Sequence, residues 1–583
     1  MAMVRPKGKG VIRRYAPIVD WLPLYDWKGD LRPDLVAGLT VWALLVPEAM
    51  AYAGIAGVPP EAGLYAAPLA LLGYAMFGSS RHLFVGPSST VAILSATVVG
   101  GVAAADGSDF WILTAWLAIV TGILFVLFGL ARMGWVANFM AASVIDGFMV
   151  GLAIVIAVGQ LDKIFGIEAE GSNAVVELGS MVVQIPAWSL PTIAVGTLSL
   201  AALFVIERFW PRLPAALLVL FVAIAASAAF DFESHGIHIV GEIPAGLPTF
   251  GFPTWVGWGT IVALVPGALA VILVGYAESY GAAKSYASRF GYQVDPNQEM
   301  IGLGVANFGA GFSQGFVVDG SLSKTAAGVG AGQKSQMTSV FCAVFVLITI
   351  VALTWLFEPL PEAVLGAIVI HAVWKLIDFS KFTKLWKIRH IDFALAIAAF
   401  LGVVLIDILQ GIIIGIVLSL LALIYRASFP EGSELGRLET DDGVHEFVGV
   451  DANPDAETLT GLVIYRQTGS LIFSNAEAFS TEARELLWKR TDPPAVLLVV
   501  DCEQIADLDV SGAEEILSLF EELQEADVDM WLTRLHGDAL ITAQKAGVID
   551  ELGEERVHPT IRVAGDMFRA RYPELGQPIA GRE

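Results

Sequence analysis

The sequence predicts a polytopic α-helical membrane protein that carries a smaller α/β domain at its C-terminal end. The 583 residues are 56% hydrophobic and only 16% charged, against about 25% charged in ordinary soluble domains. Apolar runs of roughly 18 to 22 residues, long enough for membrane helices, follow one another from residue 34 to 428. After Arg426 the composition becomes polar and acidic, and strand-like and helix-like stretches alternate, which is typical of an α/β domain.

Fourteen apolar segments, some of them short, make up the membrane part. Their approximate ranges are 34–54, 62–78, 87–100, 110–131, 135–158, 190–206, 213–230, 258–281, 299–312, 321–332, 337–356, 361–378, 391–407 and 410–427. If the N-terminus is cytoplasmic, the inner loops hold nearly all lysines and arginines, and the outer loops hold Lys163 and mostly acids. This asymmetry predicts fourteen crossings of the inner (plasma) membrane with both termini in the cytoplasm.

The same pattern divides the chain into domains. Residues 1–32 are basic and loop-like without a cleavable signal, so we expect a cytoplasmic N-terminal segment there and a transmembrane domain at 33–428. Two halves, about 34–230 and 258–428, each contain seven segments, and an odd number requires that the two repeats be inverted. The stretches 86–90 (Gly-Pro-Ser-Ser-Thr) and 320–324 (Gly-Ser-Leu-Ser-Lys) each open the third segment of a half. Short, Gly/Pro-interrupted segments at matching positions indicate a transporter site.

The stretch 320–328 predicts an anion site in the middle of the membrane. It lies in an apolar region but is too short and too polar to span the hydrocarbon. A half-helix that starts near Ser321 would direct free N–H groups and its positive dipole end at a cavity, and Lys324 adds a full positive charge one turn later. Two alternatives stay open: the small residues serve close helix packing, or Lys324 extends to the inner interface.

Two glutamates inside apolar segments predict coupling to a cation. Glu48 lies 38 residues before Gly86, and Glu278 lies 42 residues before Gly320. Acids in a membrane mark ion paths, and desolvation favours the protonated form of a carboxyl group, which allows proton loading and release. The alternatives are a structural hydrogen bond or, for either acid, pairing with Lys324 while the site is empty.

Residues near these two glutamates have expected roles as sodium ligands, as cavity lining or in the structure. Sodium could bind at Glu278 with the hydroxyls of Ser279 and Thr325. Tyr52 lies one helical turn from Glu48 and is expected to line the same cavity. Asp319 lies near a segment end, where we expect hydration and a structural role.

The C-terminal part reads as a separate acidic domain. Residues 427–583 contain 32 acidic and 12 basic residues, which argues against nucleic acid as a partner. We expect a linker and irregular lead-in at 429–458, an α/β domain at 459–575 and a tail at 576–583. Its expected elements are a hairpin of strands at 462–465 and 471–473, helices at 477–489, 511–525 and near 539–546, and strands at 495–501 and 530–532. Ser511 and Glu514 are expected to form a capping box.

Several long motifs resemble the sulfate permease (SulP) family. The resemblance covers residues 15 to 575 and rests on Val46–Ala53 (VPEAMAYA), Pro59–Ala67 (PPEAGLYAA), Ser79–His82, Val85–Pro87, Gly241–Pro248 (GEIPAGLP), Asn297–Met300 and Ala306-Asn307. The family includes sulfate, bicarbonate and dicarboxylate transporters and the exchangers pendrin and prestin. The acidic domain resembles the STAS domain that these proteins carry.

The resemblance implies roles for individual residues. It implies a core domain that moves against a gate domain, a homodimer, and an anion held between the N-termini of the third and tenth helices. These positions correspond to Ser88 and Ser89 on one side and to Ser321, Leu322 and Ser323 on the other, while Lys324 stands where sulfate-transporting and prestin-like members have Arg. Glu48 stands where many members have Gln, and Glu278 matches an acid linked to proton or sodium coupling. Ser511 matches a loop that is phosphorylated in related STAS proteins.

Together these observations predict a secondary active transporter rather than an enzyme. The favoured activity is proton-coupled sulfate uptake by alternating access. Sodium-coupled bicarbonate transport, proton-coupled dicarboxylate transport, anion exchange and channel-like conduction stay open as alternatives. The sequence shows no metal-ligand spacing, nucleophile–base pair or phosphate-binding loop, so we expect neither a hydrolase nor an ATP-driven pump, and no cofactor. The expected partners are the small anion, protons or less favourably sodium, and the lipid bilayer.

Overall fold

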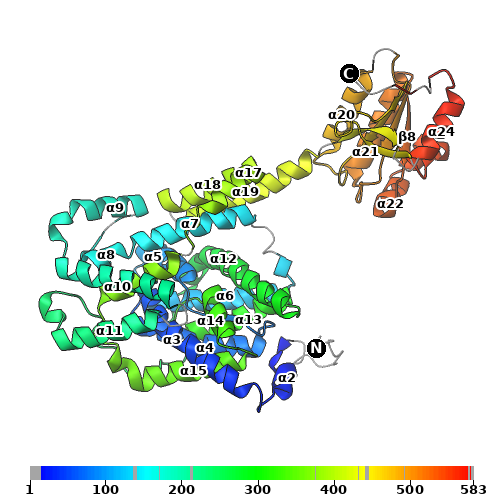
Figure 1. Cartoon of the computed structure of the whole chain (residues 1–583). Coiled ribbons are helices and arrows are strands. Elements are labelled where there is room, and N and C mark those ends of the chain that lie inside the picture. Colours follow the sequence, from blue (N-terminus) through cyan, green and yellow to red (C-terminus); the bar gives the residue numbers. More distant parts are fainter. Residues whose placement is uncertain are drawn as a thin grey trace. The chain divides into compact units, whose positions relative to one another are not determined.

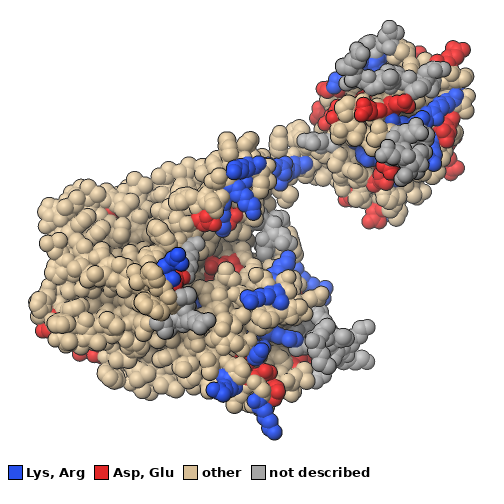
Figure 2. Space-filling model, viewed as in Figure 1, with Lys and Arg blue, Asp and Glu red and all other residues tan. Residues whose placement is uncertain are grey.

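The computed structural model describes residues 15–579 apart from 136–140, 170, 172, 211–214, 375, 407, 431, 440–444, 491–492 and 576–577. The first fourteen residues of the expected N-terminal segment and most of the expected tail at 576–583 therefore lie outside the described residues. The chain divides into two compact units, Met1–Ser419 and Leu420–Glu583 (Figure 1). Charged side chains are sparse over the visible face of the first unit, where Lys and Arg gather toward one side, and dense over the second (Figure 2).

A helix lies in each of the fourteen predicted apolar segments, and the last of them, α19, crosses the boundary between the two units. The helices are α3 (Leu31–Ile55), α4 (Pro60–Phe77), α5 (Ser89–Asp106), α6 (Phe110–Leu130), α7 (Ala142–Val158), α10 (Leu190–Phe209), α11 (Ala215–Phe230), α12 (Trp258–Phe290), α13 (Pro296–Phe312), α14 (Leu322–Gly330), α15 (Met337–Ile348), α16 (Glu362–Trp374), α18 (His390–Leu405) and α19 (Ile408–Ser428). Within the described residues, six helical stretches are long and apolar enough to cross a membrane: 31–55, 110–130, 142–165, 190–209, 258–290 and 337–356.

Some helices differ from the prediction. Helix α12 continues to Phe290, nine residues beyond the predicted end, because the chain meets no helix-breaking residue until Gly291. Gly291 adopts a φ of 67°, the left-handed conformation that ends many helices. Four short helices were not predicted, because they are brief or mix apolar with polar residues: α2 (Ile18–Trp21), α8 (Leu161–Phe165), α9 (Ala174–Val183) and α17 (Ser380–Ile388).

Two three-residue strands join the halves of the first unit. β1 (Phe84–Gly86) pairs antiparallel with β2 (Asp319–Ser321), with Val85 opposite Gly320. β1 leads into α5 and β2 leads into α14. The non-helical segments that precede these two helices therefore satisfy their backbone N–H and C=O groups by pairing with each other. The sequence did not predict this ladder, because three-residue strands of mixed composition carry no periodic signal.

Close helix packing in the first unit depends on glycine. Helix α6 packs along α13, where an added Cβ at Gly122 would lie 2.5 Å from the backbone nitrogen of Phe308. On the facing helix, an added Cβ at Gly311 would lie 2.5 Å from the carbonyl oxygen of Ala115. Small residues at such crossings allow two backbones to approach, which is a common basis of helix association in membranes.

The second unit is an α/β domain built on one six-stranded sheet of order β4-β3-β6-β7-β8-β9. The strands from β6 to β9 are parallel, and β3 and β4 are antiparallel to their neighbours. The strands are β3 (Ser433–Glu439), β4 (His445–Gly449), β6 (Leu462–Arg466), β7 (Leu497–Asp501), β8 (Asp529–Thr533) and β9 (Val557–His558). A separate ladder joins β5 (Thr458–Leu459) to β10 (Pro578–Ile579).

Two expectations about this domain are wrong. The segment expected to be a linker and irregular lead-in contributes β3, β4 and the first residue of β5, because charged residues within β3 and β4 obscure the apolar alternation of a strand. The expected hairpin does not form, since Leu471 makes a single parallel bridge with Leu508. The chain then turns, and the backbone N–H of Ile472 donates to Asn475 Oδ1 at 2.9 Å.

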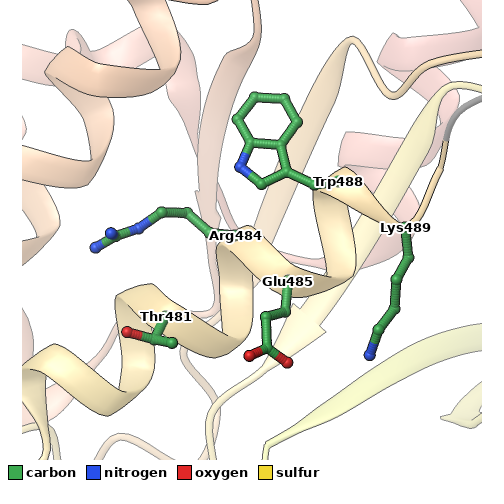
Figure 3. Close-up of a pocket in the computed structure, with 5 residues that line it drawn as sticks. All are labelled: Thr481, Arg484, Glu485, Trp488 and Lys489. Carbon is green, nitrogen blue, oxygen red and sulfur yellow. The ribbon is translucent and has the colours of Figure 1, made fainter.

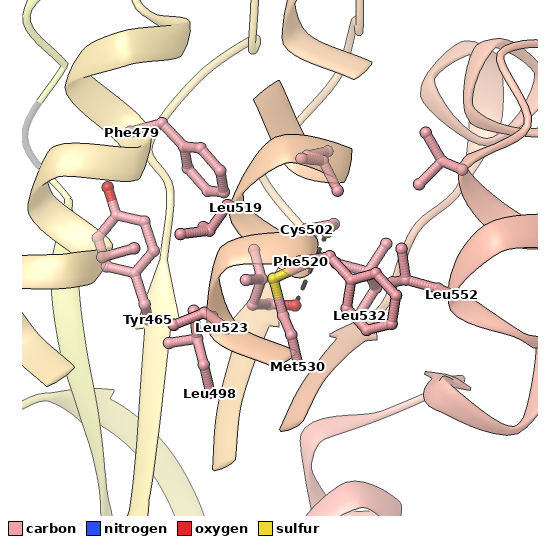
Figure 4. Packing of buried hydrophobic residues seen from close by; sticks show 14 of the residues in the cluster. Tyr465, Phe479, Leu498, Cys502, Leu519, Phe520, Leu523, Met530, Leu532 and Leu552 are labelled. Atoms are coloured by element: carbon pink, nitrogen blue, oxygen red, sulfur yellow. Dashed lines mark hydrogen bonds between the residues drawn. The ribbon is translucent and has the colours of Figure 1, made fainter. Parts of the chain in front are cut away.

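Helices cover both faces of the sheet. The helices are α20 (Ala476–Trp488), α21 (Val510–Glu525), α22 (Gly537–Lys545), α23 (Val548–Leu552) and α24 (Ile561–Arg571). The larger core cluster contains side chains of β6, β7 and β8 and of α20 to α23, among them Phe479, Leu519, Phe520 and Leu532 (Figure 4). A smaller cluster on Trp531 includes Ile561 and Phe568 of α24.

Candidate functional site

The N-termini of α5 and α14 both lie at the β1–β2 ladder. Because the two strands are antiparallel, the helices leave the ladder in opposite directions and their first turns point back toward it. Ser88 is the N-cap residue of α5, and Ser321 caps α14 by accepting a hydrogen bond from the backbone N–H of Lys324 at 3.4 Å. The half-helix expected near Ser321 therefore begins at Leu322. Two helix N-termini, each equivalent to about +0.5 elementary charge, are brought to one place.

Lys324 connects the two halves of this site. Its side chain is only 1% exposed, and its ammonium group donates to the carbonyl oxygen of Pro87 at 2.9 Å. The same ammonium group lies 2.8 Å from Glu48 Oε2, as an ion pair without the alignment of a hydrogen bond. It also lies 5.2 Å from the centre of the Tyr52 ring, a cation–π distance. Lys324 therefore does not extend to the interface, and the pairing with Glu48 that the sequence left as an alternative is present.

Two further acids, the half-buried Glu278 and the buried Asp319, lie near this pair. Among the described residues, neither Glu278 Oε2 nor either carboxylate oxygen of Asp319 has a hydrogen-bond partner. The hydroxyl of Thr90 lies beside Glu278 and that of Ser88 beside Asp319, without full hydrogen-bond geometry. Asp319 is 1% exposed, so the expectation that it lies at a hydrated segment end is wrong. The prediction failed because Asp319 is the first residue of β2, which lies in the protein interior.

The remaining predicted site residues differ in exposure. Ser88, Ser89 and Ser321 are buried, whereas Leu322 and Ser323 are exposed at the first turn of α14. The hydroxyls of Ser321 and Ser323 lie 3.0 Å apart. The site thus has a buried side at Lys324 and an open side at the start of α14.

Backbone contacts from neighbouring helices fix this arrangement. The Ser279 hydroxyl of α12 accepts a hydrogen bond from the Gly320 N–H at 2.7 Å. The Thr325 hydroxyl accepts from the Phe84 N–H at 3.0 Å and donates to the Ser321 carbonyl oxygen at 2.7 Å. These two hydroxyls, which the sequence considered as sodium ligands, are engaged in holding β1 and β2.

Ser511 lies in the second unit. The structure corrects the predicted capping box, because helix α21 begins at Val510 and its N-cap is Asp509. The Asp509 carboxylate accepts from the Gly512 N–H at 2.8 Å and from the Phe473 N–H at 2.7 Å. Ser511 is half-buried in the first turn. Over the described part of the chain, no group of three or more His, Cys, Asp or Glu could hold a metal ion.

Comparisons with known proteins agree with this architecture. The sulfate permease family model matches residues 31–399, and the STAS domain model matches residues 453–564. The chain is 34% identical over 544 residues to a probable sulfate transporter of Mycobacterium tuberculosis, covering 93% of this chain and 96% of that protein. It is 30% identical to sulfate transporter 4.1, chloroplastic, of Arabidopsis thaliana, covering 94% and 82%. The inward-facing murine Slc26a9 anion transporter superposes with a TM-score of 0.87 at 26% identity, covering 97% and 96%.

Proposed function

Because the chain belongs to the sulfate permease family, and is thus a multi-pass membrane anion transporter with a STAS domain and not an enzyme, we propose that it imports sulfate together with protons. The anion would bind between the N-termini of α5 and α14 and cross the membrane by alternating access. The relatives named as sulfate transporters support the choice of anion.

The ion pair between Lys324 and Glu48 is the observation that carries the proposal. Lys324 is the cation beside both helix N-termini, and its ammonium group is paired with the Glu48 carboxylate. An incoming sulfate must compete with this carboxylate for the same ammonium group. A proton on Glu48 removes the competitor and leaves the charge of Lys324 for the anion, so anion and proton loading favour each other.

The charge balance of the site supports the same mechanism. Glu48, Glu278 and Asp319 each lie within electrostatic reach of Lys324 and of Tyr52, and Glu278 also lies within reach of Asp319. If all three acids were ionised, the site would repel a dianion. Protons that enter with sulfate reduce this repulsion and the net charge moved against a negative-inside potential, at about 2.3 kcal/mol per charge per 100 mV.

The topology follows from the same arrangement. We infer fourteen crossings in two inverted repeats of seven, near 34–230 and 258–428, within a transmembrane domain at 33–428. The matched positions of α5 and α14, each third in its half and each preceded by a strand of one ladder, support the inversion. Lys and Arg on one side of the first unit support cytoplasmic termini in an inner (plasma) membrane (Figure 2). A homodimer and a core that moves against a gate are inferred from the family alone.

A sodium-coupled transporter, for bicarbonate among other anions, is the second candidate. The observation that favours it is the pair of acids Glu278 and Asp319, since Glu278 Oε2 and both carboxylate oxygens of Asp319 are buried without a hydrogen-bond partner among the described residues. Oxygen ligands suit hard cations. Ser279 and Thr325 contribute less than the sequence predicts, since both hydroxyls already hold backbone groups.

Sulfate uptake into proteoliposomes tests the proposal. The inside is held at pH 7.5 while the outside is stepped from pH 7.5 to 5.5. The proteins are the parent, Glu48→Gln, Lys324→Ala and the matched control Glu233→Gln, which changes an exposed residue in a short 3-10 helix. We expect the step to drive uptake in the parent and control, no driven component in Glu48→Gln, and no uptake in Lys324→Ala. Uptake that ignores the pH step but follows a sodium gradient would replace the proton mechanism with the second candidate. Uptake of bicarbonate or a dicarboxylate without sulfate would change the anion alone.

A further inference from the structure

One face of the sheet in the second unit contains a cavity of about 400 Å³. Helix α24 packs against β7, β8 and β9 on this face, and the cavity opens beside it over β3, β4 and β6. Leu435, Leu462 and Ile464 form its floor and are at most 5% exposed. Its volume falls within the range of about 300–1,000 Å³ that small-molecule sites occupy. The floor can therefore bury an apolar molecule.

Three arginines surround this floor. Arg437 projects from β3, and Arg562 and Arg569 project from α24. Glu457 and Asp566 lie among them, and their ion pairs with Arg437 and Arg569 are long, at 3.9 Å and 3.7 Å. Long pairs leave guanidinium N–H groups available, and guanidinium binds carboxylate in a bidentate manner. The lining carries one more positive than negative charge, which matches a single anionic group.

A glycine keeps the cavity open. Gly565 lies in the middle of α24, where glycine costs about 1 kcal/mol relative to alanine. It is buried and lines the cavity, yet an added Cβ would meet no atom within 4 Å. Packing against protein therefore does not require glycine here, and the empty space beyond it is the cavity itself.

A second hollow on this unit lacks these features. It lies on α20 between Thr481, Arg484, Glu485, Trp488 and Lys489 (Figure 3). Helix α20 and its C-cap residue Lys489 supply all five side chains, so no second element contributes to the lining. The cavity beside α24, by contrast, is built from three strands of the sheet, β5 and a helix.

We propose that the cavity beside α24 binds a small amphipathic anion, a monocarboxylate with a medium-length aliphatic body. The aliphatic body covers Leu435, Leu462 and Ile464, and the carboxylate meets Arg562 and Arg569. Sulfate does not fit this description, because it has no apolar part to cover the floor. This cavity is therefore a binding site for a ligand other than the sulfate that we propose is transported.

Photoaffinity labelling of the full chain in detergent micelles tests the site. The probe is an octanoate-length carboxylate with a diazirine near its apolar end, and labelled peptides are located by mass spectrometry. We expect labelling within residues 433–464 and 561–571, competed by octanoate but not by sulfate, acetate or 1-octanol. Labelling confined to the apolar helices of the first unit, or labelling that 1-octanol displaces as well as octanoate, would overturn the proposal.

Three variants and one control complete the test. Arg562→Gln/Arg569→Gln should weaken octanoate competition at least about tenfold, since charged hydrogen bonds contribute about 1.5–3 kcal/mol each. Gly565→Phe should abolish labelling by filling the cavity, and Gly565→Ala, which is compatible with the helix, should reduce it. The control Lys489→Gln/Lys545→Gln removes the same charge elsewhere on the unit and should label like the parent. Equal labelling in the arginine variant and the control would refute the proposal.

Discussion

The side-chain amide of Asn307 holds both backbone groups of Val318. Asn307 Nδ2 donates to the Val318 carbonyl oxygen at 2.8 Å, and the Val318 N–H donates to Asn307 Oδ1 at 2.9 Å. Val318 directly precedes β2, so this pairing sets where Asp319 and the start of α14 lie. A residue of α13 thereby positions one half of the anion site through the backbone of Val318.

Replacing Asn307 with Asp should misplace β2. The carboxylate cannot donate to the Val318 carbonyl oxygen, and an unsatisfied buried group costs about 1–3 kcal/mol. We expect a lower Tm in detergent and little sulfate uptake. Asn297→Asp, at the start of the same helix, is the comparison that separates a general effect on α13 from the effect on β2. Equal Tm values for the parent and Asn307→Asp would contradict the positioning role.

The ion pair between Glu48 and Lys324 should behave as a unit. Lys324→Gln leaves a buried carboxylate without its partner, and breaking a buried pair in this way costs about 3–5 kcal/mol. Glu48→Gln/Lys324→Gln should recover most of the lost Tm, because neither charge then remains. Sulfate uptake should stay absent in the double variant, since the cation is still missing. A double variant as unstable as Lys324→Gln would show that the two side chains act independently.

Asp319→Asn should strengthen sulfate binding at pH 7.5. The change removes one negative charge beside Lys324 and keeps the shape of the side chain. We expect about tenfold higher apparent affinity, or about 1.4 kcal/mol, with a weaker dependence of uptake on outside pH. Concentration-dependent uptake at pH 7.5 and 5.5 measures both. An unchanged affinity would mean that Asp319 carries no charge when sulfate binds.

His82 should make the first unit less stable in acid. Burial, and then the neighbouring Arg81, lower the pKa of His82 from 6.5 to about 4. As pH falls, the unfolded chain therefore takes up this proton before the folded chain does. The contribution to the free energy of unfolding falls between about pH 6.5 and 4, by at most about 1.4 kcal/mol per pH unit.

Thermal unfolding at pH 7.5, 6.5 and 5.5 checks this expectation. His82→Asn should lose less Tm on acidification than the parent, while His235→Asn, at an exposed position, should follow the parent. His82 stacks on Phe290 at 4.3 Å and contacts the Tyr292 hydroxyl through Nδ1 at 3.0 Å, so the variant also loses packing. The informative quantity is therefore the slope with pH. Parallel slopes for His82→Asn and the parent would rule out the titration.

Cys502 should resist thiol reagents while the second unit is folded. Burial, and then the nearby Asp501, raise the pKa of the Cys502 thiol to about 12, and the residue is fully buried. The thiolate is the reactive form, so maleimide at pH 7.5 should modify this residue only after denaturation. A Cys342→Ala background assigns any labelling to Cys502. Rapid labelling of the native protein would indicate that the unit opens.

The sequence predicted most where one periodic signal dominated. The apolar runs located fourteen helices, and the Gly-Ser pattern at 320–323 located the start of α14, because a capping serine after glycine has a local cause. The sequence also placed Tyr52 beside Glu48 by helical spacing, whereas the pairing of Glu48 with Lys324 was one of the alternatives it left open. Predictions failed where the cause lies far along the chain. β1 and β2 exist because each pairs with the other, and Asp319 is buried because of that pairing rather than its neighbours.

The errors in the second unit have the same origin. Ser511 and Glu514 satisfy the local rule for a capping box, but Asp509 is preferred because it also accepts the N–H of Phe473, 36 residues away. The three apolar residues at 471–473 suggest a strand, yet the neighbour that they meet is Leu508. Patterns in the sequence report local preference, and these choices are decided by tertiary contacts.

The β1–β2 ladder also sets the order in which the protein can be completed during synthesis. Pro87 and Lys324, which meet at this ladder, are separated by 237 residues. At about 5–20 residues per second, a ribosome needs roughly 10 to 50 s to make the chain between them. For that time, the backbone groups of Phe84–Gly86 must find temporary partners, in water or in the insertion machinery. The anion site is therefore assembled late, after most of the helices around it have been made.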